Sequence, residues 1–161
     1  MSDNSPFGMG RYLFSIITAM ALSIAPWPQT ISAFNPDWIL LVLIYWSLAV
    51  PERVGIFNGW IIGLFTDVLT GRMLGQHALT YSLVVYLCFK LHKRLRQYTL
   101  LQQGLFIFCC LFLSQLIIFW IENTQSTTHF HIYFWFPIIT GTFCWPMVYF
   151  LTRLLRLYRR F

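Results

Sequence analysis

The chain has 161 residues and a formal net charge of +6, and 58% of its residues are hydrophobic while only 10% are charged. A soluble globular domain carries about a quarter of its residues as charged side chains. The composition therefore excludes an ordinary soluble protein and indicates an integral membrane protein. The segments between the apolar runs are too short to form a second domain, so we expect residues 1–161 to be a single integral membrane domain.

Six apolar segments predict helices, at residues 12–25, 38–50, 54–69, 74–91, 98–121 and 132–151. A backbone exposed to lipid must satisfy its own hydrogen bonds, and these segments lack the alternating pattern of barrel strands. The predicted fold class is therefore all-α, a polytopic membrane protein with six transmembrane helices. The first two segments would rise only about 20 Å, less than a hydrocarbon core of about 30 Å. They must include flanking residues, thin the bilayer or pack their ends against the other helices.

Basic residues predict the orientation of these spans. One side carries a single basic residue, Arg72, and the other carries Arg11, Arg53, Lys90, Lys93, Arg94, Arg96, Arg153, Arg156, Arg159 and Arg160. The positive-inside rule then places both termini in the cytoplasm. Because these basic residues adjoin apolar spans, they indicate topology and an inner membrane surface, and we expect no nucleic-acid partner.

Small residues recur every four positions in the third segment, where Gly55, Gly59, Gly63 and Asp67 share one helix face. Glycines at this spacing allow a neighbouring helix to approach closely, so the face is predicted to pack inward and to bury Asp67.

The glycines at 71 and 75 predict a tight reversal after this helix. There Asp67 is expected to accept hydrogen bonds from backbone groups or to pair with Arg72. We favour this structural lock, although a buried acid in a membrane also stays a candidate ligand or proton site.

The first helix carries a second row of small residues, Ser15, Ala19 and Ser23, which could meet a helix of this chain or of a partner.

The sequence offers few candidate catalytic or metal-binding groups. No two of the five carboxylates lie close in sequence on one predicted helix face, and the His129 and His131 pair lacks a nearby cysteine or acid. We predict no catalytic residue, no metal site and no cofactor.

The spacing from "NPDW" through "YWSLAVPERV" to the glycine and aspartate repeat, followed by a basic turn and "LIIFWIEN", resembles the MreD family. These are rod shape-determining inner-membrane proteins of Gram-negative bacteria, and the resemblance covers nearly the whole chain. It implies a non-enzymatic scaffold of the cell-elongation complex that binds MreC. It also implies a link between peptidoglycan synthesis and MreB filaments, with RodA and the elongation transpeptidase as further members of the complex.

The resemblance also supplies an alternative function. The MreD family is similar in fold to the substrate-binding S-components of energy-coupling factor vitamin transporters, which are six-helix membrane proteins. Such subunits use small residues on their first helix to meet a coupling subunit, and Ser15, Ala19 and Ser23 are the matching feature here. The outer loops 26–37 and 122–131 carry no polar cluster suited to a vitamin. A channel or proton carrier is a third class of function. One buried acid without a relay of other polar groups would make a poor pathway for ions or protons.

The basic tail leaves two alternatives open. Continued as a helix, it places Arg153, Arg156 and Arg160 on one face, which would suit anionic lipids at the inner surface. The sharper alternative is a contact with cytoplasmic MreB.

Overall fold

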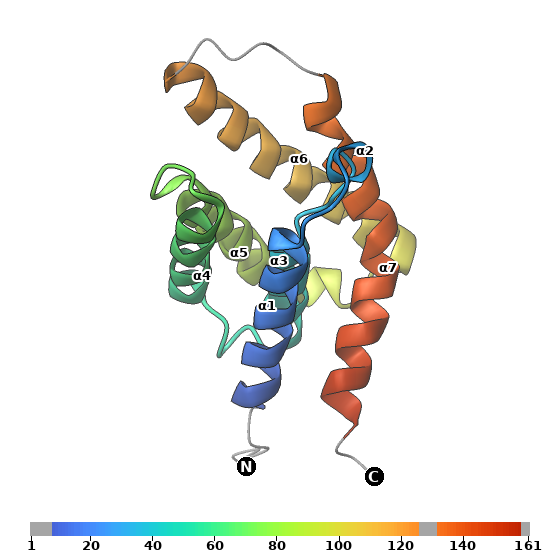
Figure 1. The fold of residues 1–161 in the computed structure, drawn as a ribbon. Helices are drawn as coiled ribbons and strands as arrows, with labels where there is room; N and C mark the ends of the chain where they lie inside the picture. The colour runs from blue at the N-terminus through green and yellow to red at the C-terminus, as the bar shows by residue number, and fades with distance from the viewer. Residues whose placement is uncertain (1–7, 126–131, 159–161) are drawn as a thin grey trace.

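The computed structural model describes residues 8–125 and 132–158 of the chain. Its elements, in chain order, are α1 (Met9–Ile24), α2 (Gln29–Ser32), α3 (Trp38–Ala49), α4 (Ile56–Thr70), α5 (Gln76–Leu95), α6 (Leu100–Gln125), the 3₁₀ helix η1 (Ile132–Trp135) and α7 (Phe136–Leu157). The described residues contain helices and no strand, so the all-α fold class is confirmed (Figure 1).

The six predicted helices correspond to α1, α3, α4, α5, α6 and α7, with ends displaced by a few residues. The short element α2 was not predicted, because its four residues are too few to show a helical period in the sequence. The 3₁₀ helix η1 lies within the predicted segment 132–151, so α7 begins only at Phe136.

Within the described residues, two helical segments are long and apolar enough to cross a membrane by length and composition, Leu100–Gln125 and Ile132–Leu157. The apolar helices α1, α3 and α4 are shorter, with 16, 12 and 15 residues. At 1.5 Å per residue they rise only about 18 to 24 Å. The shortness of the first two predicted spans is therefore confirmed, while six complete crossings stay a prediction.

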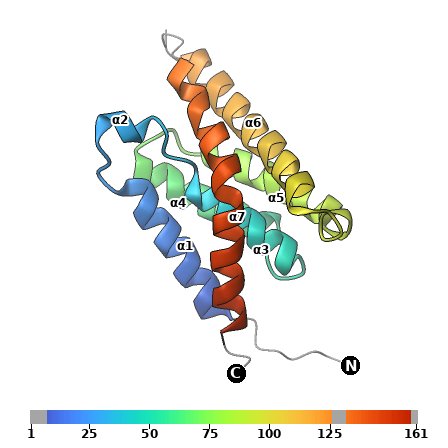
Figure 2. The same ribbon diagram turned by 90° about the vertical axis from the view of Figure 1, so that its right-hand side faces the viewer.

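The centre of the molecule is α3, the shortest of the long helices. Every residue from 39 to 47 is buried, and α1, α5 and α7 pack around it (Figures 1 and 2). A helix that is apolar on all sides is stable only when all sides are covered. The neighbouring helices therefore shield α3, which is how so short a segment can lie inside a membrane domain.

The connections between helices gather in two regions. In the first, which we call the basic end, the start of α1, the end of α3, the α5–α6 turn and the end of α7 line one cavity. In the second, which we call the turn end, an ion pair joins the α4–α5 turn to the end of α6. Stacked rings of Phe34 and Phe136, 5.0 Å apart, also bring the α2–α3 loop to the start of α7 there.

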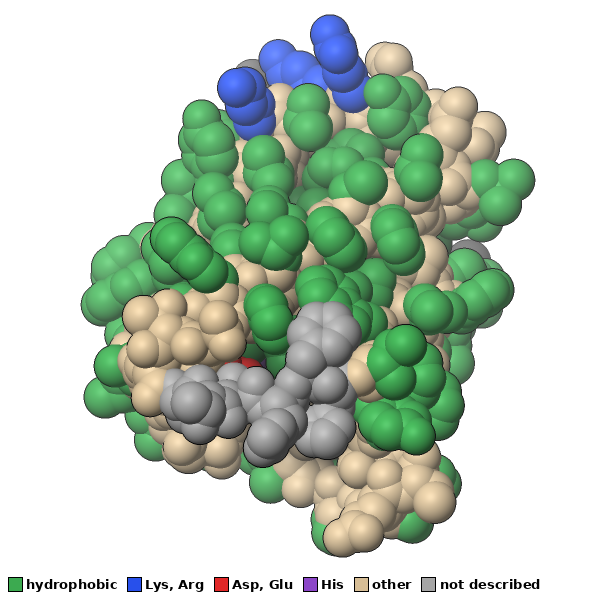
Figure 3. All heavy atoms as spheres, turned by 90° about the horizontal axis from the view of Figure 1, so that it is seen from above, with side chains coloured by type: hydrophobic (Ala, Val, Ile, Leu, Met, Phe, Trp, Pro, Cys, Tyr) green, Lys and Arg blue, Asp and Glu red, His purple; other side chains and the backbone are tan. Residues whose placement is uncertain are grey.

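The outer surface is largely apolar. Phe143 is 80% exposed and Trp120 is 71% exposed, and Figure 3 shows hydrophobic side chains over most of one face, with Lys and Arg gathered at one edge. Soluble monomers rarely expose a continuous apolar surface of this extent. The surface therefore suits lipid or other membrane helices as its surroundings.

Candidate functional site

Asp67 lies in the last turn of α4 and has no exposed surface. The helix ends at Gly71, whose φ of 63° is left-handed. Beyond it, the Arg72 backbone N–H donates to the Asp67 carbonyl oxygen at 3.1 Å, and the Gly71 N–H donates to Val68 O at 3.3 Å. This pair of bonds is a Schellman motif. It turns the chain back so that α5 begins beside the carboxylate of Asp67.

The Asp67 carboxylate accepts hydrogen bonds from the start of α5. Its Oδ2 accepts from the backbone N–H of Gly75 at 2.9 Å and of Ala78 at 3.4 Å. Its Oδ1 accepts from the backbone N–H of His77 at 3.0 Å and lies 2.7 Å from the ring Nδ1 of the same residue. The first N–H groups of a helix have no partner within it, and Gly75 has no side chain with which to cap them. Asp67 therefore caps α5 from the neighbouring helix.

The alternative pairing of Asp67 with Arg72 is wrong. Arg72 Nη1 lies 2.6 Å from Glu122 Oε1, and Gln76 Nε2 donates to the same oxygen at 3.2 Å. Backbone groups of α5 already occupy both oxygens of Asp67, and the side chain of Arg72 is 42% exposed at the tip of the turn. Arg72 therefore reaches outward to α6 and ties the α4–α5 turn to it.

Three further residues of the turn end, His77, Tyr81 and Asp37, were not predicted as site residues. The His77 ring lies against the Asp67 carboxylate and packs edge-on against Tyr81, with ring centroids 5.5 Å apart. The Tyr81 hydroxyl lies 2.8 Å from both carboxylate oxygens of Asp37. Asp37 in turn caps α3 by accepting from Leu40 N at 3.1 Å. An aspartate directly before an apolar run is an N-cap signal that could have identified Asp37, whereas no local pattern marks His77.

The glycine row of α4 packs against α5 along part of its length. A Cβ atom added at Gly63 would lie 2.5 Å from Ala78 N and 2.6 Å from His77 O. At Gly59 it would lie 3.1 Å from the carbonyl oxygen of Tyr81. The two backbones therefore approach so closely at Gly63 that no side chain fits between them.

The other three glycines do not contribute to this packing. Gly55 was predicted to belong to the row, but a Cβ there would meet nothing within 4 Å, because it precedes α4 as its N-cap residue. Gly71 and Gly75 also have open space around them and are required for their φ values of 63° and 102°. They shape the reversal, as the sequence predicted.

The small residues of α1 are partly occupied within the chain. Ser15 and Ala19 are buried, and the Trp46 Nε1 of α3 donates to Ser15 Oγ at 2.9 Å. Ser23 is only half-buried. Ser15 and Ala19 are therefore buried within this chain, where Ser15 contacts α3.

Two arginines hold helix ends at the basic end. Arg96 donates from Nε to Leu48 O at 3.0 Å and from Nη2 to Ala49 O at 2.9 Å, at the end of α3. Arg11 Nη1 donates to Arg156 O at 3.0 Å, near the end of α7. Basic side chains near a helix C-terminus satisfy its last carbonyl groups.

The remaining predicted basic residues fall into three groups. Arg153 and Arg156 line the cavity with Arg11, Arg53 and Arg96, while Lys90, Lys93 and Arg94 are exposed near the end of α5. Arg159 and Arg160 lie outside the described residues, as do His129 and His131. Within residues 8–125 and 132–158, no group of three or more His, Cys, Asp or Glu side chains could hold a metal ion.

Comparison with known proteins places the chain in a family. Residues 5–157 match the family described as "rod shape-determining protein MreD". A protein of that name from Haemophilus influenzae is 36% identical over 144 residues, which cover 87% of this chain and 86% of the relative. No solved structure matches, so the similarity in fold to transporter S-components stays a prediction. Since both matches extend over most of the chain, it belongs to the MreD family of rod shape-determining membrane proteins.

Proposed function

We propose that this chain is a non-enzymatic scaffold of the cell-elongation complex, which binds MreC and links peptidoglycan synthesis to MreB filaments. RodA and the elongation transpeptidase are further members of the proposed complex. Membership of a rod shape-determining family supports a role in cell shape. The proposal adds the partners and the way in which they are bound.

One structural observation carries the proposed mode of binding. Phe143, Met147 and Phe150 lie at i, i+4 and i+7 on α7 and are 80%, 56% and 62% exposed. Residues at this spacing form a continuous stripe along one helix face. In a membrane such a stripe offers side-chain packing to another helix, and we assign it to the membrane segment of MreC.

The proposed orientation places the basic end in the cytoplasm. The structure gathers Arg11, Arg53, Arg96, Arg153 and Arg156 around a single cavity. Basic residues next to membrane helices are retained on the cytoplasmic side. This arrangement supports six crossings of the inner membrane with both termini inside.

The arrangement of two acids, the buried Asp67 and the half-buried Asp37, supports a structural role. Asp67 and Asp37 each accept hydrogen bonds from the first turn of a helix. Their carboxylates are thus engaged in capping α5 and α3. General acid–base chemistry needs a carboxyl group placed against a substrate, and these two groups contact the protein's own backbone and the side chains of His77 and Tyr81.

Co-purification with tagged MreC from detergent tests the proposal. Replacing Phe143 and Phe150 together by Ala should reduce recovery of MreC and should turn rods into spheres in cells that depend on this chain. The matched control replaces Phe14 and Ile17 of α1, which are 61% and 63% exposed, by Ala. The control should retain both properties, because it removes a similar apolar surface from a different helix.

Two outcomes would contradict the scaffold proposal. The first is a wild-type chain that recovers no MreC, and the second is a depleted strain that keeps rods of normal width. The S-component alternative predicts instead that a small ligand remains bound during purification. Mass spectrometry of the denatured sample would detect it, and vitamin uptake would then fall on depletion.

A further inference from the structure

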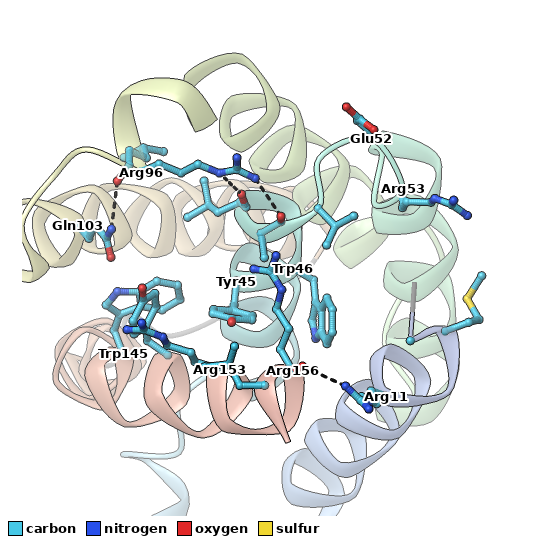
Figure 4. A pocket seen from close by; sticks show the side chains of 18 of the residues that line it. Arg11, Tyr45, Trp46, Glu52, Arg53, Arg96, Gln103, Trp145, Arg153 and Arg156 are labelled. Atoms are coloured by element: carbon cyan, nitrogen blue, oxygen red, sulfur yellow. Dashed lines mark hydrogen bonds between the residues drawn. The ribbon is translucent and has the colours of Figure 1, made fainter. Parts of the chain in front are cut away.

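The cavity at the basic end has a volume of about 1180 Å³. Its lining comes from the start of α1, the end of α3 with the following loop, the α5–α6 turn, the first turn of α6 and the C-terminal half of α7 (Figure 4). None of the contacts at the turn end involves it. It is therefore a second and separate feature of the molecule.

One face of α7 lines this cavity, and its side chains change from aromatic to basic along the helix. Trp145, Tyr149 and Arg153 line it at intervals of four residues, so they lie along one side of the helix. Trp145 is fully buried, and Arg153 is exposed. The wall thus passes from aromatic rings in the interior to guanidinium groups toward the end of the helix. Tyr45 and Trp46 of α3 add further rings to the lining, as Figure 4 shows.

The charged groups that line the cavity are five arginines and one glutamate, a formal balance of +4 (5 − 1). In Figure 4, Glu52 points away from the centre of the opening, while Arg156 projects from α7 toward Tyr45 and Trp46. Arg11 and Arg96 are held in place by backbone carbonyl groups. A guanidinium has five N–H donors, so these two arginines keep donors beyond those that hold the helix ends.

Two buried polar atoms of residues that line the cavity have no hydrogen-bond partner within the part of the chain that the structure describes. They are the Nε1 of Trp145, which is a donor, and the Oε1 of Gln103, which is an acceptor. The amide nitrogen of Gln103 is engaged, since Nε2 donates to Leu95 O at 3.0 Å. A buried polar atom left unpaired is costly. A molecule that fits this cavity would therefore supply an acceptor, a donor and negative charge.

We propose that the cavity binds an anionic phospholipid whose headgroup carries hydroxyl groups, with phosphatidylglycerol as the probe. The phosphate would accept from the guanidinium groups of Arg153 and Arg156, since arginine donates to phosphate in a bidentate manner. An ester carbonyl would accept from Trp145 Nε1, and a headgroup hydroxyl would donate to Gln103 Oε1.

The same features disfavour other occupants. A lipid with a cationic headgroup would bring its ammonium group against the surplus of arginines. A small soluble anion would leave the aromatic wall without an apolar partner. The inference concerns a cytoplasm-facing lipid site and does not depend on the proposed binding of MreC.

Lipid binding to the purified full-length chain tests the inference. Native mass spectrometry in detergent would follow titration with phosphatidylglycerol, phosphatidylmethanol or phosphatidylcholine of matched acyl chains. Phosphatidylglycerol should bind at least about tenfold more tightly than the zwitterionic lipid. It should also bind about 2- to 10-fold more tightly than phosphatidylmethanol, which has the same charge and lacks the headgroup hydroxyls.

Variants localise the site. The double variant Arg153→Gln and Arg156→Gln should lose at least about tenfold in affinity for phosphatidylglycerol. The control, Lys93→Gln and Arg94→Gln, removes the same charge from exposed residues outside the cavity and should bind like wild type. Trp145→Phe keeps an aromatic ring and removes the donor, so it should weaken binding about 2- to 10-fold. Melting temperatures without added lipid would identify any variant that fails to fold.

Three results would overturn the inference. One is equal affinity for phosphatidylglycerol and phosphatidylcholine, and another is equal loss in the cavity variant and its control. The third is complete competition by free glycerol phosphate at concentrations similar to those of the lipid, which would make the cavity a site for a soluble anion.

Discussion

The turn end and the basic end of this molecule differ in how the hydrogen-bonding capacity of their buried polar groups is satisfied. At the turn end, the carboxylate of Asp67 accepts hydrogen bonds from the first turn of α5 and has no exposed surface. At the basic end, arginines line a cavity together with Trp145 and Gln103, whose Nε1 and Oε1 atoms have no hydrogen-bond partner among the described residues. At the turn end, the hydrogen-bonding groups of the Asp67 carboxylate thus bind other groups of the same chain. At the basic end, donors and acceptors remain with which the proposed lipid could form hydrogen bonds. A buried charge in a membrane protein is therefore by itself no sign of a ligand.

The largest expected effect comes from breaking the turn end at Asp67. Asp67→Leu removes the acceptor for the N–H groups of Gly75 and His77, and it leaves the His77 donor buried and the Gly75 donor partly buried. At about 1–3 kcal/mol for each unpaired group, the loss should reach about 4 kcal/mol. Thermal unfolding in detergent and the amount of protein in the membrane would measure it.

Asp67→Asn sharpens the same test. One oxygen remains as an acceptor, but the amide NH₂ replaces the other, which accepts from Gly75 in the native chain. The variant should therefore fall between wild type and Asp67→Leu. A role that needs the charge predicts equal damage from both variants, and a neutral Asp67→Leu would contradict the capping role.

A smaller effect is expected where α4 meets α5. Gly63→Ala adds a Cβ atom 2.5 Å from Ala78 N, so the two helices must separate, at a cost of about 1–3 kcal/mol. Gly104→Ala in α6 is the matched control, because a Cβ there meets nothing within 4 Å. The control should be stabilising by up to about 1 kcal/mol, since Ala favours a helix over Gly. Equal melting temperatures for the two variants would contradict the close approach.

At the basic end, Arg96→Gln should cost about 1 kcal/mol, because the side chain loses its two bonds to the carbonyl groups of Leu48 and Ala49. The neighbouring Arg94→Gln removes the same charge and should leave thermal stability unchanged. This pair separates arginines that hold the fold from those that only carry charge. A wild-type melting temperature for Arg96→Gln would show that α3 needs no such cap.

The smallest effect is expected for the ion pair of Arg72 and Glu122. Their side chains are 42% and 32% exposed, and exposed pairs contribute about 0.2–1 kcal/mol. A double-mutant cycle with Arg72→Gln and Glu122→Gln, followed by thermal unfolding, would measure the coupling. A coupling well above this range would mean that the pair behaves as a buried one.

The contacts that the sequence predicted well are those between residues close in the chain. Asp67, Gly71 and Gly75 lie within one helical hairpin, so four-residue spacing and turn chemistry were enough to predict a buried acid at a reversal with backbone partners. Gly55 shows the limit of this argument. It shares the spacing, but α4 begins only after it, and the end of a helix cannot be read from spacing alone.

The sequence by itself determined an all-helical membrane domain, its main helices and the reversal at Asp67, because composition and short periods report burial in lipid and local hydrogen bonding. Only the tertiary structure decided that Arg72 meets Glu122 and that Tyr81 meets Asp37. It alone placed Gln103 and Trp145 in one cavity with the arginines. Such residues lie far apart along the chain, and their distances depend on how α3, α5, α6 and α7 pack, which no local pattern specifies.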